Sequence, residues 1–354
     1  MTAQFLSRYG VAMAMGCLLA LVLEPLVLWW ARHFGIIDKP NWRKIHTGTV
    51  ARAGGVVFLP ALVIALGVTL SLWPVFWRER YVGLISGALI VTLAGLWDDI
   101  YGMRPAIKLG CQFLAGAALF AFGYQMQEIG IPWVSNVVEV GPLSFLITVV
   151  GTAAIINAIN MLDGLDGLAA GSVVIMCGFL LFNKIVQGAW AGGIVLVIVM
   201  GAGLGFLRYN FYPAKVFMGD TGSMFLGLVL AAETFDSVSQ GTAVAALLLP
   251  LVILGIPIFD MLRTIVTRAR AARHIFAADK SHLHHRLLEL GLTHRQVVLF
   301  VYAMNVYMGI MATIYKHVAP EYRGLYLLSM GLFLFLAFYL VAIGNKSERS
   351  DGAP

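Results

Sequence analysis

Amide and carboxylate side chains recur every three residues in the segment Asn157-Ala-Ile-Asn160-Met-Leu-Asp163-Gly-Leu-Asp166-Gly. On a helix this spacing places the four polar side chains along one stripe. The residues before them are apolar, and a polar stripe that faced lipid would be very costly. We therefore expect these side chains to face protein, water or a bound cation.

Two other segments carry carboxylates near the end of an apolar run. Asp98 and Asp99 end one run, and Asp220 lies in the turn Phe217-Met-Gly-Asp-Thr-Gly before another. Neighbouring carboxylates repel one another unless they share a cation, and oxygen ligands suit Mg²⁺. Lysine, arginine and histidine side chains, which bind phosphate groups, are interleaved with these acids. The pattern indicates a substrate that carries a diphosphate bridged by Mg²⁺.

The composition requires a membrane protein. Of the 354 residues, 60% are hydrophobic and 12% are charged, and the mean hydropathy is +0.86, which excludes a soluble domain of this length. The apolar runs predict an all-α polytopic integral membrane protein with about eleven transmembrane helices, in one domain over residues 1–354. The predicted spans are 9–31, 54–73, 81–97, 108–124, 143–162, 168–187, 189–207, 222–235 (the shortest), 242–266, 296–315 and 323–343.

The distribution of Lys and Arg predicts the orientation. Most of them fall in alternate loops and in the carboxyl tail, whereas Arg8, Arg78, Arg80 and Lys184 are among the few on the other side. Short cytoplasmic loops retain positive charge, so we expect the N-terminus outside and the C-terminus in the cytoplasm. The acidic segments then lie on the cytoplasmic face. Binding of anionic lipid headgroups would explain the basic loops, but it would not explain the acids among them.

Five motifs occur in order between residues 38 and 295 and together resemble the polyprenyl-phosphate N-acetylhexosamine-1-phosphate transferases. The motifs are Asp38-Lys-Pro-Asn41-x-Arg43-Lys44-x-His46 followed by Arg52-x-Gly54-Gly55, then Trp97-Asp98-Asp99, the Asn157 to Gly167 segment, Phe217-Met-Gly-Asp220-Thr-Gly-Ser, and Asp279-Lys-Ser-His282-Leu-His284-His285-Arg286-Leu. One short motif would mean little, whereas five in sequence are specific.

The resemblance implies transfer of a sugar 1-phosphate from a UDP-N-acetylhexosamine to undecaprenyl phosphate, with release of UMP, as the first membrane step of cell-surface polysaccharide synthesis. It implies a multi-pass protein of the bacterial cytoplasmic (inner) membrane, with Mg²⁺ as cofactor and Mn²⁺ as the alternative ion. The form of the last motif resembles the branch that acts on UDP-N-acetylglucosamine. The expected partners are the two substrates and membrane lipids, with no nucleic acid; a homodimer and the downstream polymer stay open.

The resemblance also implies roles for particular residues. The metal would be held by Asp220, with Asn160 and Asp163. The catalytic residues would be Asp98, Asp99, Asp163, Asp166 and His284. The substrate-binding residues would be Lys44, Arg52, Lys108, Asn157, Asn160, Phe217, His282, His285 and Arg286. A phosphate monoester with a second pKa of about 6 is already mostly dianionic near neutrality, so we interpret Asp98 as a positioning or proton-accepting group and Asp99 as a structural or metal-side partner.

Simpler roles exist for most of these side chains. Asp220 could cap the next helix, the Asn and Asp stripe could form a hydrogen-bond network between helices, and the basic residues could anchor the membrane surface. A zinc site in the histidine motif is rejected, because the motif has no nearby cysteine and its adjacent histidines point in different directions. For the whole chain, the alternative is an ion- or proton-coupled transporter, whose acids should lie near mid-membrane instead of at one edge.

Overall fold

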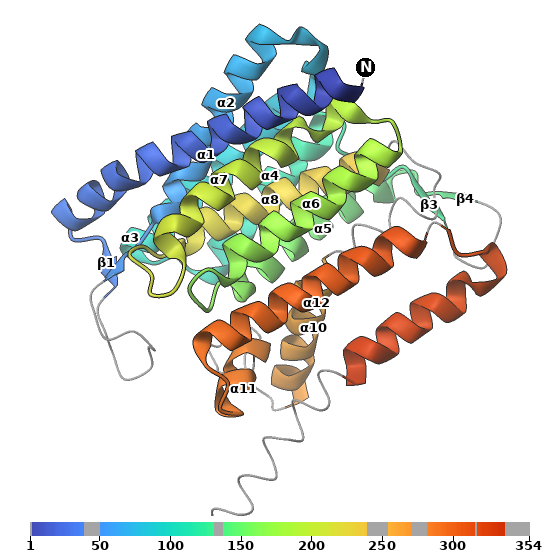
Figure 1. Ribbon diagram of the computed structural model, residues 1–354. Helices are drawn as coiled ribbons and strands as arrows, with labels where there is room; N and C mark the ends of the chain where they lie inside the picture. The colour runs from blue at the N-terminus through green and yellow to red at the C-terminus, as the bar shows by residue number, and fades with distance from the viewer. Residues whose placement is uncertain are drawn as a thin grey trace, which may run out of the picture.

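The computed structural model describes residues 2–38, 50–130, 137–238, 254–270, 282–315 and 317–336, and over these ranges the chain is mostly helical (Figure 1). The helices are α1 (Thr2–His33), α2 (Phe58–Leu72), α3 (Arg80–Tyr101), α4 (Pro105–Ala121), α5 (Leu143–Leu162), α6 (Leu168–Val186), α7 (Ile194–Asn210), α8 (Gly219–Val238), α10 (Gly255–Arg270), α11 (Leu283–Glu289), α12 (His294–Tyr315) and a last apolar helix, Arg323–Leu336. Short 3-10 turns precede α2 (η1, Gly54–Val57), α3 (η2, Pro74–Phe76), α7 (η3, Trp190–Gly193) and the last helix (η4, Pro320–Tyr322).

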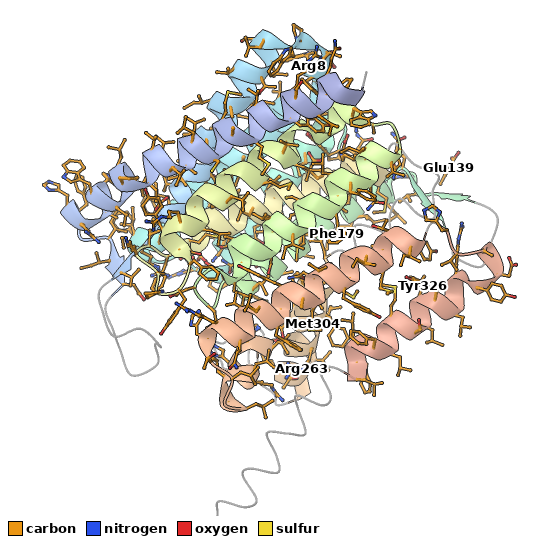
Figure 2. All side chains as sticks on the ribbon, viewed as in Figure 1. Arg8, Glu139, Phe179, Arg263, Met304 and Tyr326 are labelled. Carbon is orange, nitrogen blue, oxygen red and sulfur yellow. The ribbon has the colours of Figure 1, made fainter. Side chains whose placement is uncertain are left out.

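Two small antiparallel hairpins lie at opposite ends of the bundle. β1 (Ile37–Asp38) pairs with β2 (Val50–Ala51), and β3 (Glu128–Gly130) pairs with β4 (Val137–Glu139). The end with β1 also holds α11 and the turns between α5 and α6 and between α7 and α8 (Figure 1). The end with β3 and β4 carries Arg8 and Glu139 (Figure 2).

Within the described ranges, seven helical segments are long and apolar enough to cross a membrane: α1, η1 with α2, α3, α5, α6, η3 with α7, and α12. α4 and the last helix are shorter apolar helices, and α8 carries three acids along its 20 residues. The chain is therefore a multi-pass helical membrane protein. The count of eleven spans and the orientation stay predictions, and residues 239–253 of the predicted ninth span lie outside the described residues.

α8 is the central helix of the bundle. Every residue from Thr221 to Asp236 is buried, as expected for a helix that is apolar on all sides. Glycines let its neighbours come close: a Cβ on Gly95 of α3 would lie 2.6 Å from the Thr221 Cα, and one on Gly227 would lie 2.6 Å from the Ile156 Cα of α5. Small residues allow this kind of close helix packing in membranes. The packing brings the ends of α3 and α5 beside the first turn of α8.

The last turns of α8 join a buried ionic network at the end of the bundle that holds β3 and β4. Lys184 Nζ lies 2.8 Å from Glu233 Oε2 and 2.5 Å from Asp236 Oδ2. Arg78 and Arg80 pair with Asp236 at 2.9 and 2.7 Å. Lys184 is thus a buried member of the bundle, although its sequence position indicated an outer loop. Its charge is tolerated there because it is paired on two sides.

Candidate active site

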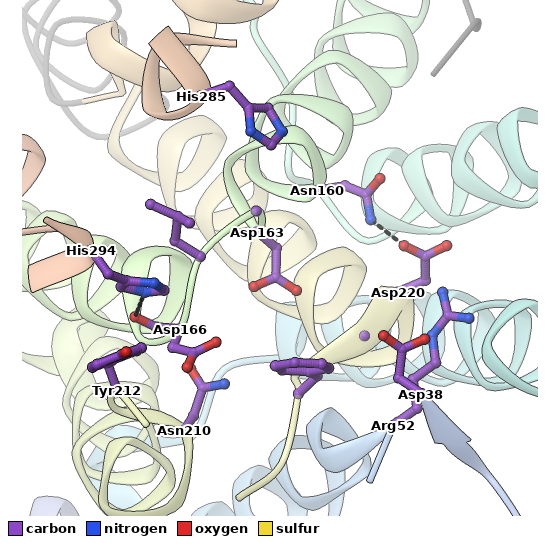
Figure 3. A pocket seen from close by; sticks show the side chains of 14 residues that line it. Asp38, Arg52, Asn160, Asp163, Asp166, Asn210, Tyr212, Asp220, His285 and His294 are labelled. Carbon is purple, nitrogen blue, oxygen red and sulfur yellow. Dashed lines mark hydrogen bonds between the residues drawn. The ribbon is translucent and has the colours of Figure 1, made fainter. Parts of the chain in front are cut away.

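A pocket of about 530 Å³ lies beside β1 and α11, which contribute Asp38 and His285 to its lining. Its volume is typical of small-molecule sites. Figure 3 shows the side chains that point into it. Those expected from the sequence are Arg52, Asn160, Asp163, Asp166, Phe217, Asp220 and His285; the others are Asp38, Gly164, Leu165, Asn210, Tyr212, Gly219 and His294.

Asp220 stands in the first turn of α8, and both of its carboxylate oxygens are engaged. The Asn160 amide donates to Asp220 Oδ1 at 2.5 Å and to Ser223 Oγ at 2.8 Å (Figure 3). The Lys108 ammonium donates to Asp220 Oδ2 and, at 2.9 Å, to Asp98 Oδ2. Segments that are more than a hundred residues apart in sequence therefore place two carboxylates against a single ammonium group.

The adjacent acids Asp98 and Asp99 face different partners. The Asp99 side chain is fully buried and accepts hydrogen bonds from the backbone N–H groups of Asp220 and Thr221, each at 3.0 Å, and from Thr221 Oγ1 at 2.6 Å. An acid in this position caps a helix and complements its N-terminal partial charge. Arg52 Nε lies 3.4 Å from the same carboxylate. The geometry favours a structural role for Asp99 and leaves Asp98, with Lys108, on the side of Asp220.

Asp163 and Asp166 follow the C-terminal end of α5 and behave differently. The Asp163 side chain makes no hydrogen bond to the part of the chain that the structure describes, and it points into the pocket (Figure 3). Burial, followed by repulsion from the carboxylates of Asp220, Asp99 and Asp166, raises the pKa of Asp163 to about 8. Asp166 Oδ2 accepts a hydrogen bond from the Ala214 N–H at 2.9 Å. Asp166 therefore fixes the α7–α8 turn, whereas Asp163 is available to a ligand.

The turn that carries Phe217 is held by the first motif of the chain. The Phe217 N–H donates to the Ala51 carbonyl of β2 at 2.9 Å, and its own carbonyl accepts from the Gly54 N–H at 2.9 Å. The Gly55 N–H donates to the Met218 carbonyl at 3.0 Å. A side chain on Gly55 would collide with the backbone of Gly222, so this close approach requires glycine. The Arg52-x-Gly54-Gly55 segment thus positions the Phe217 ring in the pocket.

The histidine motif is anchored by Asp260 of α10. Asp260 contacts His282 Nδ1 at 3.0 Å, accepts from the Leu283 N–H at 2.9 Å and forms an ion pair with Arg263 at 3.7 Å. His284 is buried, with its ring against Gly164. Burial, followed by repulsion from His285, His282 and His294, lowers the pKa of His284 well below its usual value.

Several expected site residues do not line the pocket in the described part of the chain. Asn157 instead donates to Gln112 Oε1 of α4 at 2.6 Å and to the Ala153 carbonyl at 2.7 Å, which is the interhelical network considered from the sequence. From the described part of the histidine motif only His285 lines the pocket, and His282, His284 and Arg286 do not. Lys44 lies outside the described residues.

The pocket also holds side chains that the sequence analysis did not select. Asn210 accepts a hydrogen bond from the Gly167 N–H at 3.0 Å and donates to the Val216 carbonyl at 2.9 Å, so it joins the two turns that frame the pocket. The rings of Tyr212 and His294 stack with centroids 4.5 Å apart. Asp38 begins the first motif, which is a signal that could have identified it. Tyr212 and His294 are 82 positions apart and have no common motif.

The donor set fits Mg²⁺ better than a metal held by protein alone. No group of three or more His, Cys, Asp or Glu side chains in the described ranges could hold an ion. Mg²⁺ is commonly bound through one or two carboxylates, with water and substrate phosphates as the other ligands. Asp98 and Asp220 already share one cationic group, the ammonium of Lys108. The residues present therefore fit an ion that Asp220 binds and a diphosphate completes, with the Asn160 amide orienting that carboxylate.

Comparison with known proteins gives consistent matches. The family model described as glycosyl transferase family 4 matches residues 81–238. Over 347 residues the chain is 34% identical to the probable undecaprenyl-phosphate N-acetylglucosaminyl 1-phosphate transferase of Bacillus subtilis (strain 168), covering 97% of this chain and 94% of that protein.

Two further relatives carry related names. The decaprenyl-phosphate N-acetylglucosaminephosphotransferase of Mycobacterium tuberculosis (strain ATCC 25618 / H37Rv) is 36% identical over 309 residues, or 80% of this chain and 75% of that protein. The undecaprenyl-phosphate alpha-N-acetylglucosaminyl 1-phosphate transferase of Escherichia coli (strain K12) is 27% identical over 317 residues, or 86% of this chain and 84% of that protein. Taken with the motifs and the pocket, these matches show that the chain belongs to the polyprenyl-phosphate N-acetylglucosamine-1-phosphate transferase family.

Proposed function

We propose that this enzyme transfers N-acetylglucosamine 1-phosphate from UDP-N-acetylglucosamine to undecaprenyl phosphate, with Mg²⁺ as cofactor and Mn²⁺ as a substitute, at the cytoplasmic face of the bacterial inner membrane. The observation that carries the proposal is that Asp220, the Phe217 ring and the Asp163 carboxylate line one pocket. Asp98 and Lys108 do not line it, but Lys108 joins Asp98 to Asp220 directly beside it. The names of the relatives support the same donor sugar and lipid acceptor. They describe transferases, so the transporter alternative is not carried further.

The reaction exchanges one diphosphate for another. An oxygen of the lipid phosphate attacks the phosphorus that carries the sugar and forms a new P–O bond. The bond from that phosphorus to the bridging oxygen breaks, and UMP leaves with the electron pair. Such transfers depend mostly on positioning and on neutralisation of charge, and a bound divalent cation would neutralise the negative charge of the diphosphate.

Different residues of the chain would hold the ion, the phosphates and the base. Asp220, oriented by Asn160, would hold the ion, and Lys108 would bind a phosphate oxygen. The ring of Phe217 offers a flat apolar face on which uracil can stack. Asp98 touches Lys108 and lies near the metal ligand, so it would position the acceptor phosphate, which is already mostly dianionic near neutral pH.

The histidine motif would contribute to sugar recognition through His285, which lines the pocket. His284 packs beside it, with ring centroids 4.3 Å apart. Because the pKa of His284 lies well below its usual value, that ring stays neutral and can support His285 without repelling it. We therefore assign His285 to the substrate and His284 to the placement of His285.

The test is release of UMP by the purified protein in detergent. We expect UMP only when UDP-N-acetylglucosamine, undecaprenyl phosphate and Mg²⁺ are all present, with loss of activity in excess EDTA and recovery on addition of Mn²⁺. UDP-N-acetylgalactosamine and UDP-glucose serve as matched donors for the choice of sugar. UMP release that continues in EDTA, or that does not depend on the lipid phosphate, would refute the proposal.

A further inference from the structure

Lys108 occupies an unusual place for a residue expected to bind substrate. Its ammonium lies between Asp98 and Asp220, and the side chains of Lys108, Asp98 and Asp220 are only 17%, 15% and 20% exposed. Ion pairs at this degree of burial are screened less by water and salt than surface pairs. Lys108 is therefore held firmly on the carboxylate to which the ion is assigned.

Each carboxylate oxygen of Asp220 already has one hydrogen-bonding partner. Its Oδ1 accepts from Asn160, and its Oδ2 accepts from Lys108. The Asn160 bond orients the carboxylate and carries no charge. The Lys108 bond brings a positive charge to the same oxygen, and a divalent cation at that place would be repelled by it. The ion can bind tightly only if the ammonium leaves.

Lys108 can move, whereas its second partner is fixed. Asp98 is tied to the start of the α3–α4 connection through the Met103 N–H, which donates to Asp98 Oδ1 at 2.5 Å. Lys108 lies in the first turn of α4, and its long flexible stem allows the ammonium to swing while its backbone stays in place. The ammonium can therefore leave Asp220 and stay near Asp98.

We propose that Lys108 is an internal competitor of the divalent cation, and that it leaves Asp220 for a phosphate oxygen when the ion and substrate bind together. The inference rests on the proposed function, because it takes Asp220 as the metal ligand. Its consequence is that the ion alone binds weakly and that ion and phosphate bind cooperatively, since the phosphate accepts the displaced ammonium. By linkage, each ligand then tightens the other by the same factor.

The experiment measures Mn²⁺ binding to purified, substrate-free protein by electron paramagnetic resonance. In Lys108→Met we expect Mn²⁺ to bind about tenfold more tightly than in the wild type, because one charge-assisted hydrogen bond no longer has to be broken. Lys215→Met is the matched control: Lys215 is exposed, lies just before the Phe217 turn and has the same charge. Its loss should leave the affinity unchanged within about twofold, as expected for an exposed charge.

A second measurement tests the coupling. In the wild type, UMP should tighten Mn²⁺ binding. In Lys108→Met this effect should become smaller, because the phosphate can still ligate the ion but no longer accepts a displaced ammonium. Lys108→Gln, which keeps a hydrogen-bond donor without the charge, gives the same test if the Met variant does not fold. Equal or weaker Mn²⁺ binding in the folded neutral variants would overturn the inference.

The two proposals fail in different ways. Suppose that Asp220→Asn loses Mn²⁺ binding but the Lys108 variants keep the affinity of the wild type. The competition between Lys108 and the ion would then be refuted, and Asp220 would remain the metal ligand. Mn²⁺ binding that is unaffected by Asp220→Asn would remove the metal assignment itself.

Discussion

Replacement of Asp99 by Asn tests whether the two adjacent acids of α3 have separate roles. The buried Asp99 carboxylate accepts three hydrogen bonds from the first turn of α8. A hydrogen bond to a charged acceptor contributes about 1.5–3 kcal/mol, and a negative charge at a helix N-terminus adds about 0.3–1 kcal/mol. The Asn amide would turn an NH₂ group toward at least one N–H or O–H donor. We therefore expect Asp99→Asn to lower the free energy of unfolding by about 2–4 kcal/mol.

The assay combines thermal unfolding in detergent with steady-state kinetics. Asp99→Asn should lower the melting temperature and also weaken Mn²⁺ binding and raise KM for the UDP-sugar, because Asp220 shifts when its helix turn loosens. Thr221→Val is the graded control, since it removes only the hydroxyl bond at 2.6 Å and should cost about 1 kcal/mol. The effects of the two substitutions on the free energy of unfolding should be less than additive, because both act on the same carboxylate.

A different outcome would refute this reasoning. If Asp99→Asn keeps the melting temperature and the Mn²⁺ affinity of the wild type but loses turnover, Asp99 takes part in the chemical step and not only in placing Asp220.

Three further predictions concern the pocket. Asp220→Asn should abolish turnover and Mn²⁺ binding while the protein stays folded; full activity in this variant would remove the metal assignment. Gly164→Ala should destabilise the protein by about 1–3 kcal/mol and lower turnover, because the new methyl group would collide with the buried ring of His284; an unchanged melting temperature would contradict this packing. The pKa of Asp163 is about 8 in the metal-free protein, so below that pH the ion must displace a proton. Mn²⁺ affinity should then rise about 25-fold between pH 6.5 and 8.5, and titrations that give equal affinity would exclude Asp163 as a ligand.

The sequence was sufficient to predict most helices and the end of the bundle that holds the site. The predicted span 143–162 coincides with α5, and 168–187 differs from α6 by one residue. These signals are local, because an apolar run that ends in polar residues and glycine marks its own boundary. The motifs likewise identified Asp220, Asn160, Asp163 and Phe217, which the structure places around one pocket.

The separate roles of residues that are adjacent in sequence could not be predicted. Asp98 and Asp99 are consecutive, and their side chains leave α3 about 100° apart. Which one meets α8 depends on how α3 packs against it at Gly95 and Thr221. The stacking of Tyr212 on His294 could not be predicted for the same reason, because the two rings come together only when segments distant in the sequence pack against each other. In each case the missing information is the packing of one helix or turn against another.

Lys184 shows the same limit at the other end of the molecule. A lysine near the end of an apolar run normally indicates a loop or the membrane surface. Here it pairs with Glu233 and Asp236 inside the bundle. Lys184 is 52 positions from Asp236 in the sequence, and no local pattern relates it to the two acids.

The attachment of α8 at both ends affects how the enzyme responds to changes in bilayer thickness. Asp99 holds the first turn, and the cations around Asp236 hold the last. A rod of 20 residues, or roughly 30 Å, that is fastened at each end cannot slide or swivel when the surrounding lipid becomes thicker or thinner. A difference between the thickness of the bilayer and the length of the apolar helices must then be accommodated by the lipid and by the outer helices. The position of the active site relative to the membrane surface is therefore set by the protein and does not follow the length of the acyl chains around it.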